Sequence, residues 1–166
     1  SDVCSSDLVA NRDFESRLRW CVAGKYEDAN HKPVIAIPGG LEKTVKSGET
    51  VTLNADITEP DSLDIDGIWA KYSALYEQLG FNKESFVEIA PQRYPKYNAY
   101  WWQYKEAGTY NGYIDIVAVD SGKSTFVAPK VDKPETLHLI LEVTDTGIPA
   151  LTTFARVIVT IFPTDK

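Results

Sequence analysis

The hydrophobic pattern of the chain changes its period near Pro33. Before that residue, Phe14, Leu18 and Val22 recur at helical spacing among charged neighbours, which predicts an amphipathic helix over residues 11–23. After it, apolar and polar residues alternate in short runs that are separated by turn signals, and this is the period of β-strands. A lone amphipathic helix cannot bury its own apolar stripe, so we expect it to be the last helix of a separate domain whose body is missing from this chain.

The alternating runs predict an all-β fold. The alternation is clearest in residues 136–144, where Leu137, Leu139, Leu141 and Val143 share one face. About seven or eight short strands in one domain are typical of an immunoglobulin-like β-sandwich. We predict strands over residues 34–37, 42–45, 50–56, 98–104, 113–119, 124–128, 136–144 and 152–162.

One segment interrupts the strand pattern. Residues 66–79 carry apolar side chains at helical spacing, and Gly80 follows as a stop signal. Residues 83–89 are expected to continue this helix. We therefore predict one helical insertion, spanning residues 64–92, in a loop of the sandwich.

Composition limits the kind of partner. The chain has 166 residues, a formal net charge of −7 and a pI near 4.8, which opposes nucleic acid because phosphate backbones are bound by clustered Lys and Arg. No stretch approaches the roughly 20 apolar residues of a membrane span. The two cysteines are too few for a disulfide scaffold. We expect neither a nucleic-acid partner nor a membrane partner.

The chain is expected to be a piece of a longer protein, because it contains no methionine. Residues 1–8, SDVCSSDL, look like the translation of a sequencing-library adapter and are set aside as an artefact. Residues 25–33 are polar and end in a proline, which indicates a linker. The sandwich with its insertion then occupies residues 34–162.

The strand NAYWWQY carries the most informative side chains. Alternation sends Trp101 to the core face and places Tyr100, Trp102 and Tyr104 together on the other face. Such a row spans roughly 13 Å and offers flat apolar faces to consecutive sugar rings. The competing interpretation is that the insertion helix 66–79, or a neighbouring domain, covers the row.

Five strings together resemble one bacterial family. They are RDFESRLRWCV (12–22), ANHKPV (29–34), SGETVTLNA (47–55), WWQYKEAGTY (101–110) and LHLILEVTDTGIPALTTFARVIVTI (137–161). In that family, a nucleoside-hydrolase-like domain precedes a C-terminal domain described as cellulose-binding and similar to immunoglobulin-like or PKD-like sandwiches. The resemblance implies that residues 9–24 are the last helix of a truncated hydrolase-like domain.

The same resemblance implies a function. We expect a non-catalytic, carbohydrate-binding or cellulose-binding accessory module of a secreted or periplasmic protein, with a polysaccharide and the missing hydrolase-like domain as partners. The alternative is a structural domain that packs on the hydrolase-like domain and stabilises it. The parent protein is then a candidate N-glycosyl or nucleoside hydrolase, while this chain is not an enzyme.

Acidic residues just before and at the start of the insertion are the weak candidates for a metal site. Five carboxylates lie close together in sequence and are hard oxygen ligands that suit a structural calcium ion, although their spacing matches no EF-hand: Asp56, Glu59, Asp61, Asp64 and Asp66. No other cofactor is expected. His31 and His138 lack a nucleophile or metal partner at motif spacing, and Asp145 is expected to form a local turn with Gly147.

Overall fold

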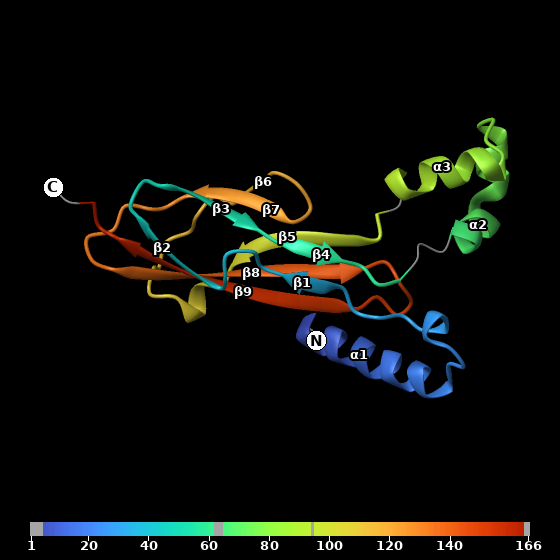
Figure 1. Ribbon diagram of the computed structural model, residues 1–166, viewed down its shortest axis with the longest axis horizontal. Coiled ribbons are helices and arrows are strands. Elements are labelled where there is room, and N and C mark those ends of the chain that lie inside the picture. Colours follow the sequence, from blue (N-terminus) through green and yellow to red (C-terminus); the bar gives the residue numbers. More distant parts are fainter. Residues whose placement is uncertain (1–4, 62–64, 94, 165–166) are drawn as a thin grey trace.

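The computed structural model describes residues 5–61, 65–93 and 95–164, which form a β-rich molecule with helical attachments (Figure 1). The helices are α1 (Ser5–Val22), α2 (Ile65–Gln78) and α3 (Lys83–Arg93), with 3₁₀ turns η1 (Tyr26–Asp28) and η2 (Lys105–Ala107). The strands are β1 (Val34–Ala36), β2 (Glu42–Lys46), β3 (Thr50–Asn54), β4 (Asp56–Thr58), β5 (Tyr97–Gln103), β6 (Val117–Ala118), β7 (Lys123–Val127), β8 (Glu135–Asp145) and β9 (Thr152–Phe162).

The strands form three sheets. The largest has four strands in the order β2-β9-β8-β5, in which β2 runs parallel to β9 and the other neighbours are antiparallel. A three-stranded sheet has the order β3-β7-β6, and β1 pairs with β4 in a two-stranded sheet. The predicted β-rich fold is confirmed.

The core lies between the four-stranded and three-stranded sheets. The inward residues of β8 are almost fully buried, and they pack with Val51 and Leu53 of β3 and Phe126 of β7. Burying one such side chain contributes about 1.5–3 kcal/mol, so the alternation in β8 alone supplies a large share of the driving force. The inward residues of β8 are Leu137, Leu139, Leu141 and Val143.

Two predicted strands differ in the structure. Residues 50–56 divide into β3 and β4, and β4 leaves the three-stranded sheet to pair with β1. Of the strand predicted over residues 113–119, only Val117–Ala118 forms. The side chain of Gln103 replaces the missing ladder bonds, since it donates to the carbonyl of Gly112 (3.0 Å) and accepts from the N–H of Ile114 (3.1 Å).

The insertion contains two helices rather than one continuous helix. Gly80 ends the first with a positive φ of 86°. Asn82 then starts the second, because its side chain accepts from the N–H of Ser85 (2.8 Å) while the Ser85 hydroxyl accepts from the N–H of Asn82 (3.0 Å). The hairpin of α2 and α3 has its own small core of Tyr76, Phe86 and Ala90 and projects beyond the end of the sheets (Figure 1).

Helix α1 is attached to the β body through Asn30. The Asn30 side chain donates to Asp145 Oδ2 (2.9 Å) and to the carbonyl of Pro149 (2.8 Å), while its own carbonyl accepts from Ser16 Oγ and Trp20 Nε1. The segment 25–33, predicted as a linker, is therefore bonded to both parts. The apolar residues Phe14, Leu18 and Val22 remain exposed on the other face of the helix.

Candidate functional site

The outer face of the four-stranded sheet carries the aromatic residues that the sequence singled out. Tyr100 and Trp102 alternate with Trp101 along β5, so they lie on the side of the sheet that faces away from the core. Trp101 is 7% exposed and belongs to the core, and its Nε1 donates to the carbonyl of Gly122 (3.2 Å). The predicted separation of Trp101 from its aromatic neighbours is confirmed.

The three candidate residues are not equally accessible. Tyr100 is 52% exposed and Tyr104 is 40% exposed, whereas Trp102 is partly buried. The rings of Trp102 and Tyr104 have centroids 5.9 Å apart and planes inclined by 65°. The row along β5 is thus on the surface, but its rings do not form one flat strip.

The helical insertion does not cover this row. Trp69 of α2 packs inside the hairpin against Phe86 (centroids 5.3 Å apart) and Tyr76 (6.4 Å). Tyr72, which lies in the same predicted helix, is itself exposed on α2. The interpretation that the insertion buries Tyr100, Trp102 and Tyr104 is therefore wrong, because the hairpin uses its aromatic residues for its own core.

Further residues extend the face across β8 and β9. Tyr100 pairs with Glu142, which pairs with Phe154, and Trp102 pairs with Ile140, which pairs with Arg156. Directly opposite residues of antiparallel strands point to the same side of a sheet. Phe154 is 49% exposed. Local alternation does not predict these neighbours, because pairing between distant strands leaves no local signal in the sequence.

Charged groups on the face interact with the aromatic residues. Burial and a hydrogen bond to Glu142 raise the pKa of Tyr100 to about 12, so its hydroxyl donates to that carboxylate at neutral pH. Burial and the nearby Arg156 guanidinium lower the pKa of His138, which favours the neutral imidazole. Trp102 Nε1 and His138 Nδ1 are buried atoms with no hydrogen-bond partner among the described residues.

The candidate calcium ligands fall into separate environments. Asp56 is exposed on β4, and Asp66 on α2 pairs with Lys83 (2.7 Å). Glu59 and Asp61 are neighbours, since the N–H of Asp61 donates to Glu59 Oε1 (3.1 Å). Asp64 lies outside the described residues. Within the part of the chain that the structure describes, no three His, Cys, Asp or Glu side chains are grouped to hold a metal ion.

Glu59 and Asp61 instead belong to a polar junction beneath α1. Asp61 accepts from the N–H of His31 (2.6 Å) and contacts His31 Nδ1 (2.9 Å), and the imidazole is stacked between Tyr26 and Trp20. Burial raises the pKa of Glu59, and the nearby Asp145 and Asp61 carboxylates raise it further. This junction fixes the segment that carries α1.

Asp145 is the most buried carboxylate of the junction, at 3% exposure. Its Oδ1 accepts from the N–H of Gly147 and of Leu151, both at 2.9 Å, which confirms the predicted turn with Gly147. Burial raises the pKa of Asp145, and the hydrogen bonds from Leu151, Gly147 and Asn30 partly offset this rise. Its role is to hold the turn between β8 and β9.

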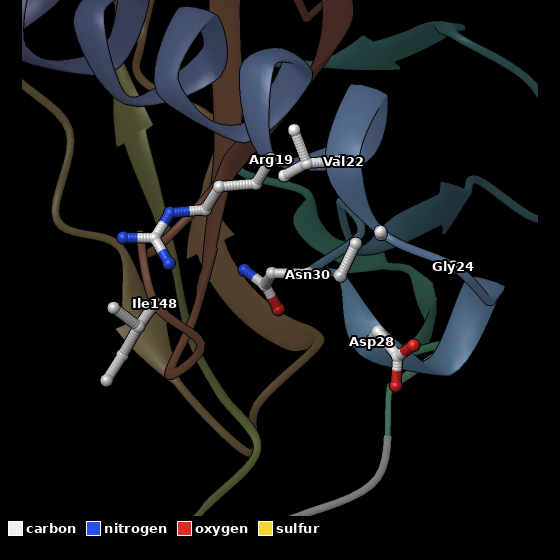
Figure 2. Close-up of a pocket in the computed structure, with 8 residues that line it drawn as sticks. Arg19, Val22, Gly24, Asp28, Asn30 and Ile148 are labelled. Carbon is white, nitrogen blue, oxygen red and sulfur yellow. The ribbon is translucent and has the colours of Figure 1, made fainter.

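A shallow pocket of about 330 Å³ lies where the end of α1 meets this turn (Figure 2). Figure 2 shows Asn30 at the centre of the view, with Arg19 and Ile148 to its left and Gly24 and Asp28 to its right. Arg19 is engaged by Glu15 (2.8 Å) and Asn30 by Asp145, so these two polar side chains of the pocket already have partners. The pocket is a consequence of how α1 docks.

Among the described residues, no helix has both the length and the apolar character that crossing a membrane requires.

Two packed sheets, an exposed aromatic face and peripheral helices define a β-rich module whose candidate site is an exposed sheet face. Residues 95–161, which include β5, β8 and nearly all of β9, match the family model described as the cellulose-binding protein Sde0182, C-terminal domain. The resemblance expected from the sequence is thereby confirmed over the region that carries the aromatic face. A comparison with curated proteins gave no match.

Solved structures support the fold. A nucleoside hydrolase-related hypothetical protein from Saccharophagus degradans, associated with carbohydrate metabolism, superimposes with a TM-score of 0.69 and 22% identity. The alignment covers 93% of this chain and 31% of that protein, so this chain spans about a third of its length. A 2,6-sialyltransferase from Photobacterium sp. JT-ISH-224 gives a TM-score of 0.37 at 13% identity. The alignment covers 74% of this chain and 17% of that protein, and the score is too low to indicate a shared fold.

Proposed function

We propose that the chain is a non-catalytic carbohydrate-binding accessory module with an immunoglobulin-like or PKD-like sandwich, which binds cellulose or a related neutral glucan without a cofactor. The observation that carries this proposal is the open aromatic face within residues 95–161, the region matched to a cellulose-binding family. Aromatic faces pack well against the C–H surfaces of sugar rings. The net charge of −7 favours a neutral glycan over a polyanionic one.

The contacts we assign to the glycan are Tyr100, Trp102 and Tyr104. The energetic argument is that half-exposed aromatic rings contribute little to the core, while large apolar side chains on a flat surface are typical of binding sites. By the same resemblance, we propose that the module acts in a secreted or periplasmic protein alongside a nucleoside-hydrolase-related domain.

The test is retention of the 166-residue chain on microcrystalline cellulose, measured as a depletion isotherm. The double variant Tyr100→Ala with Tyr104→Ala is expected to bind at least about tenfold more weakly, because two ring contacts are lost. Tyr72→Ala is the matched control, since it removes an exposed tyrosine from α2, away from the sheet face. A wild-type chain that stays in solution, or a double variant that binds normally, contradicts the proposal.

A second candidate function is support of a neighbouring domain through α1. The observation in its favour is the outward stripe of Phe14, Leu18 and Val22, which the β body leaves uncovered. In a protein that joins this module to a hydrolase-related domain, Leu18→Ser should lower the melting temperature of the whole, yet leave that of the present chain unchanged. An unchanged melting temperature in both would contradict this second function.

A further inference from the structure

The outer face contains a row of side chains that runs across the strands rather than along β5. Tyr100 of β5 lies opposite Glu142 of β8, and Glu142 lies opposite Phe154 of β9. Because paired residues share a side of the sheet, the three side chains stand in line. The two rings are separated by two strand spacings, which is about 10 Å.

The rings at the two ends of this transverse row are the most exposed aromatic side chains of β5, β8 and β9. Tyr100 is 52% exposed and Phe154 is 49% exposed. Along β5, by contrast, the planes of Trp102 and Tyr104 are inclined by 65°, and Trp102 Nε1 is buried. A chain of sugar rings lying flat along β5 would not meet both faces, whereas the transverse row ends in two open rings.

A hydrogen-bonding group separates these two rings. The Tyr100 hydroxyl donates to Glu142, which fixes the phenol and the carboxylate together. A carboxylate has about four acceptor positions, so Glu142 retains capacity for the hydroxyl groups of a sugar. Arg156 is two residues from Phe154 along β9 and lies in the next row, opposite Ile140. It forms no ion pair among the described residues and offers donors beside Glu142 and Phe154.

The chemistry of a β-1,4-linked glucan fits this spacing. Successive glucose units are rotated by half a turn, so every second unit presents the same ring face to a surface. Rings that are about 10 Å apart are matched to alternate units, with one unit bridging them. The bridging unit would lie over Glu142, where its hydroxyl groups meet an acceptor.

We propose that a β-1,4-glucan crosses β5, β8 and β9, with alternate glucose units stacked on Tyr100 and Phe154 and the unit between them hydrogen-bonded to Glu142. This inference rests on the proposed carbohydrate-binding function and adds the ligand axis and a contact residue, Phe154, that local sequence reasoning missed. The smallest ligand that engages both rings is a trisaccharide.

The experiment is calorimetric titration of the full chain with cellobiose, cellotriose and cellotetraose. The wild type is expected to bind cellotriose about tenfold more tightly than cellobiose, because only the longer ligand reaches both rings. Phe154→Ala should weaken cellotriose binding about tenfold and abolish the preference for cellotriose over cellobiose. Tyr104→Ala should weaken cellotriose binding less than Phe154→Ala does and should leave the preference for cellotriose over cellobiose intact, because Tyr104 lies outside the transverse row.

Matched variants separate binding from folding. Phe162→Ala removes a 42% exposed phenylalanine from the far end of the same strand, roughly 27 Å from Phe154, and should leave cellotriose affinity unchanged. Phe154→Tyr keeps an aromatic ring and should retain wild-type binding, which keeps the proposal testable if Phe154→Ala does not fold.

The outcomes distinguish the direction of the glucan on the sheet from carbohydrate binding itself. If the wild type binds cellotriose and Tyr104→Ala is damaging while Phe154→Ala is harmless, the glucan lies along β5 and the transverse axis is wrong, although carbohydrate binding stands. If the wild type binds neither cello-oligosaccharides nor cellulose, both the axis and the proposed function fail.

Discussion

The two outer faces of the β body follow the same alternation and carry different side chains. The outer face of the three-stranded sheet presents Thr50, Thr52 and Asn54 from β3 and Val127 from β7. The outer face of the four-stranded sheet presents Tyr100, Trp102 and Phe154, with Glu142 and Arg156 among them. The first set is typical of a solvated strand face, because the β-branched Thr and Val side chains favour strands and carry no large rings.

The contrast indicates what the aromatic residues are for. Both sheets bury the same kind of inner face, so the fold does not require large rings on the outer face of only one. Large exposed rings add apolar surface that a monomeric protein normally avoids. Their concentration on one sheet supports the binding role proposed above for this face.

The largest effect is expected when the stabilities of inner-face and outer-face variants are measured together. Leu139→Ala should lower the free energy of unfolding by about 2–5 kcal/mol, because it opens a cavity in a fully buried position. Thr52→Ala and Tyr100→Ala, on the two outer faces, should each cost less than about 1 kcal/mol. Urea denaturation followed by tryptophan fluorescence measures all three. A cost for Tyr100→Ala as large as that of Leu139→Ala would make the aromatic face part of the stabilising core.

The attachment of α1 provides the second test, because it should affect stability and leave the aromatic face unaffected. Asn30→Ala removes the bonds to Asp145 and Pro149 and leaves a buried carboxylate less satisfied, so we expect a loss of about 1–3 kcal/mol. Affinity for cellotriose should stay within about twofold of wild type. Chemical denaturation and calorimetry provide the two readouts, and Asn54→Ala on the outer face of β3 is the control.

A parallel loss of affinity in Asn30→Ala would show that glycan binding depends on the docked helix. In that case the open sheet face would no longer be a sufficient description of the site. The close packing at this point is also visible at Gly147, where any added Cβ would collide with the Asn30 side chain.

The inner half of the fold was predictable from sequence, since local alternation decides which residues are buried. The row Leu137, Leu139, Leu141 and Val143 was assigned to the core from its period alone, and all four are at most 1% exposed. The stop at Gly80 was equally local, because a positive φ suits glycine. These features depend on near neighbours in sequence.

The outer site was only partly predictable. Tyr100 could be found because its neighbours in β5 are aromatic, but Phe154 is 54 residues away and becomes its row partner only through the register of β5, β8 and β9. Where a strand was predicted over residues 113–119, the Gln103 side chain instead bonds the backbone of residues 112 and 114. Strand propensity does not reveal such side-chain bonds to the backbone. Long-range pairing and side-chain bonds to the backbone therefore account for most of the differences.

The smallest expected effect comes from removing the Tyr100 hydroxyl. This change separates the contribution of the aromatic ring from that of the hydrogen bond to Glu142. The pKa of Tyr100 is raised from 10.0 to about 12 in the folded protein, so the folded state keeps this proton longer than the unfolded chain does. The associated stability is fully present below pH 10 and is lost as the pH rises through about 12.

Tyr100→Phe removes this titration while retaining the ring. Between pH 10 and 12, the free energy of unfolding of the variant should therefore fall less steeply than that of the wild type, and the ultraviolet titration should lack one late tyrosinate. At neutral pH, we expect a change in stability below about 1 kcal/mol and a loss of cellotriose affinity of about twofold, because stacking survives and only the fixing of Glu142 is lost. A loss as large as that of Tyr100→Ala would mean that the phenol binds the sugar through its hydroxyl, and that the contrast between the two outer faces is polar rather than aromatic.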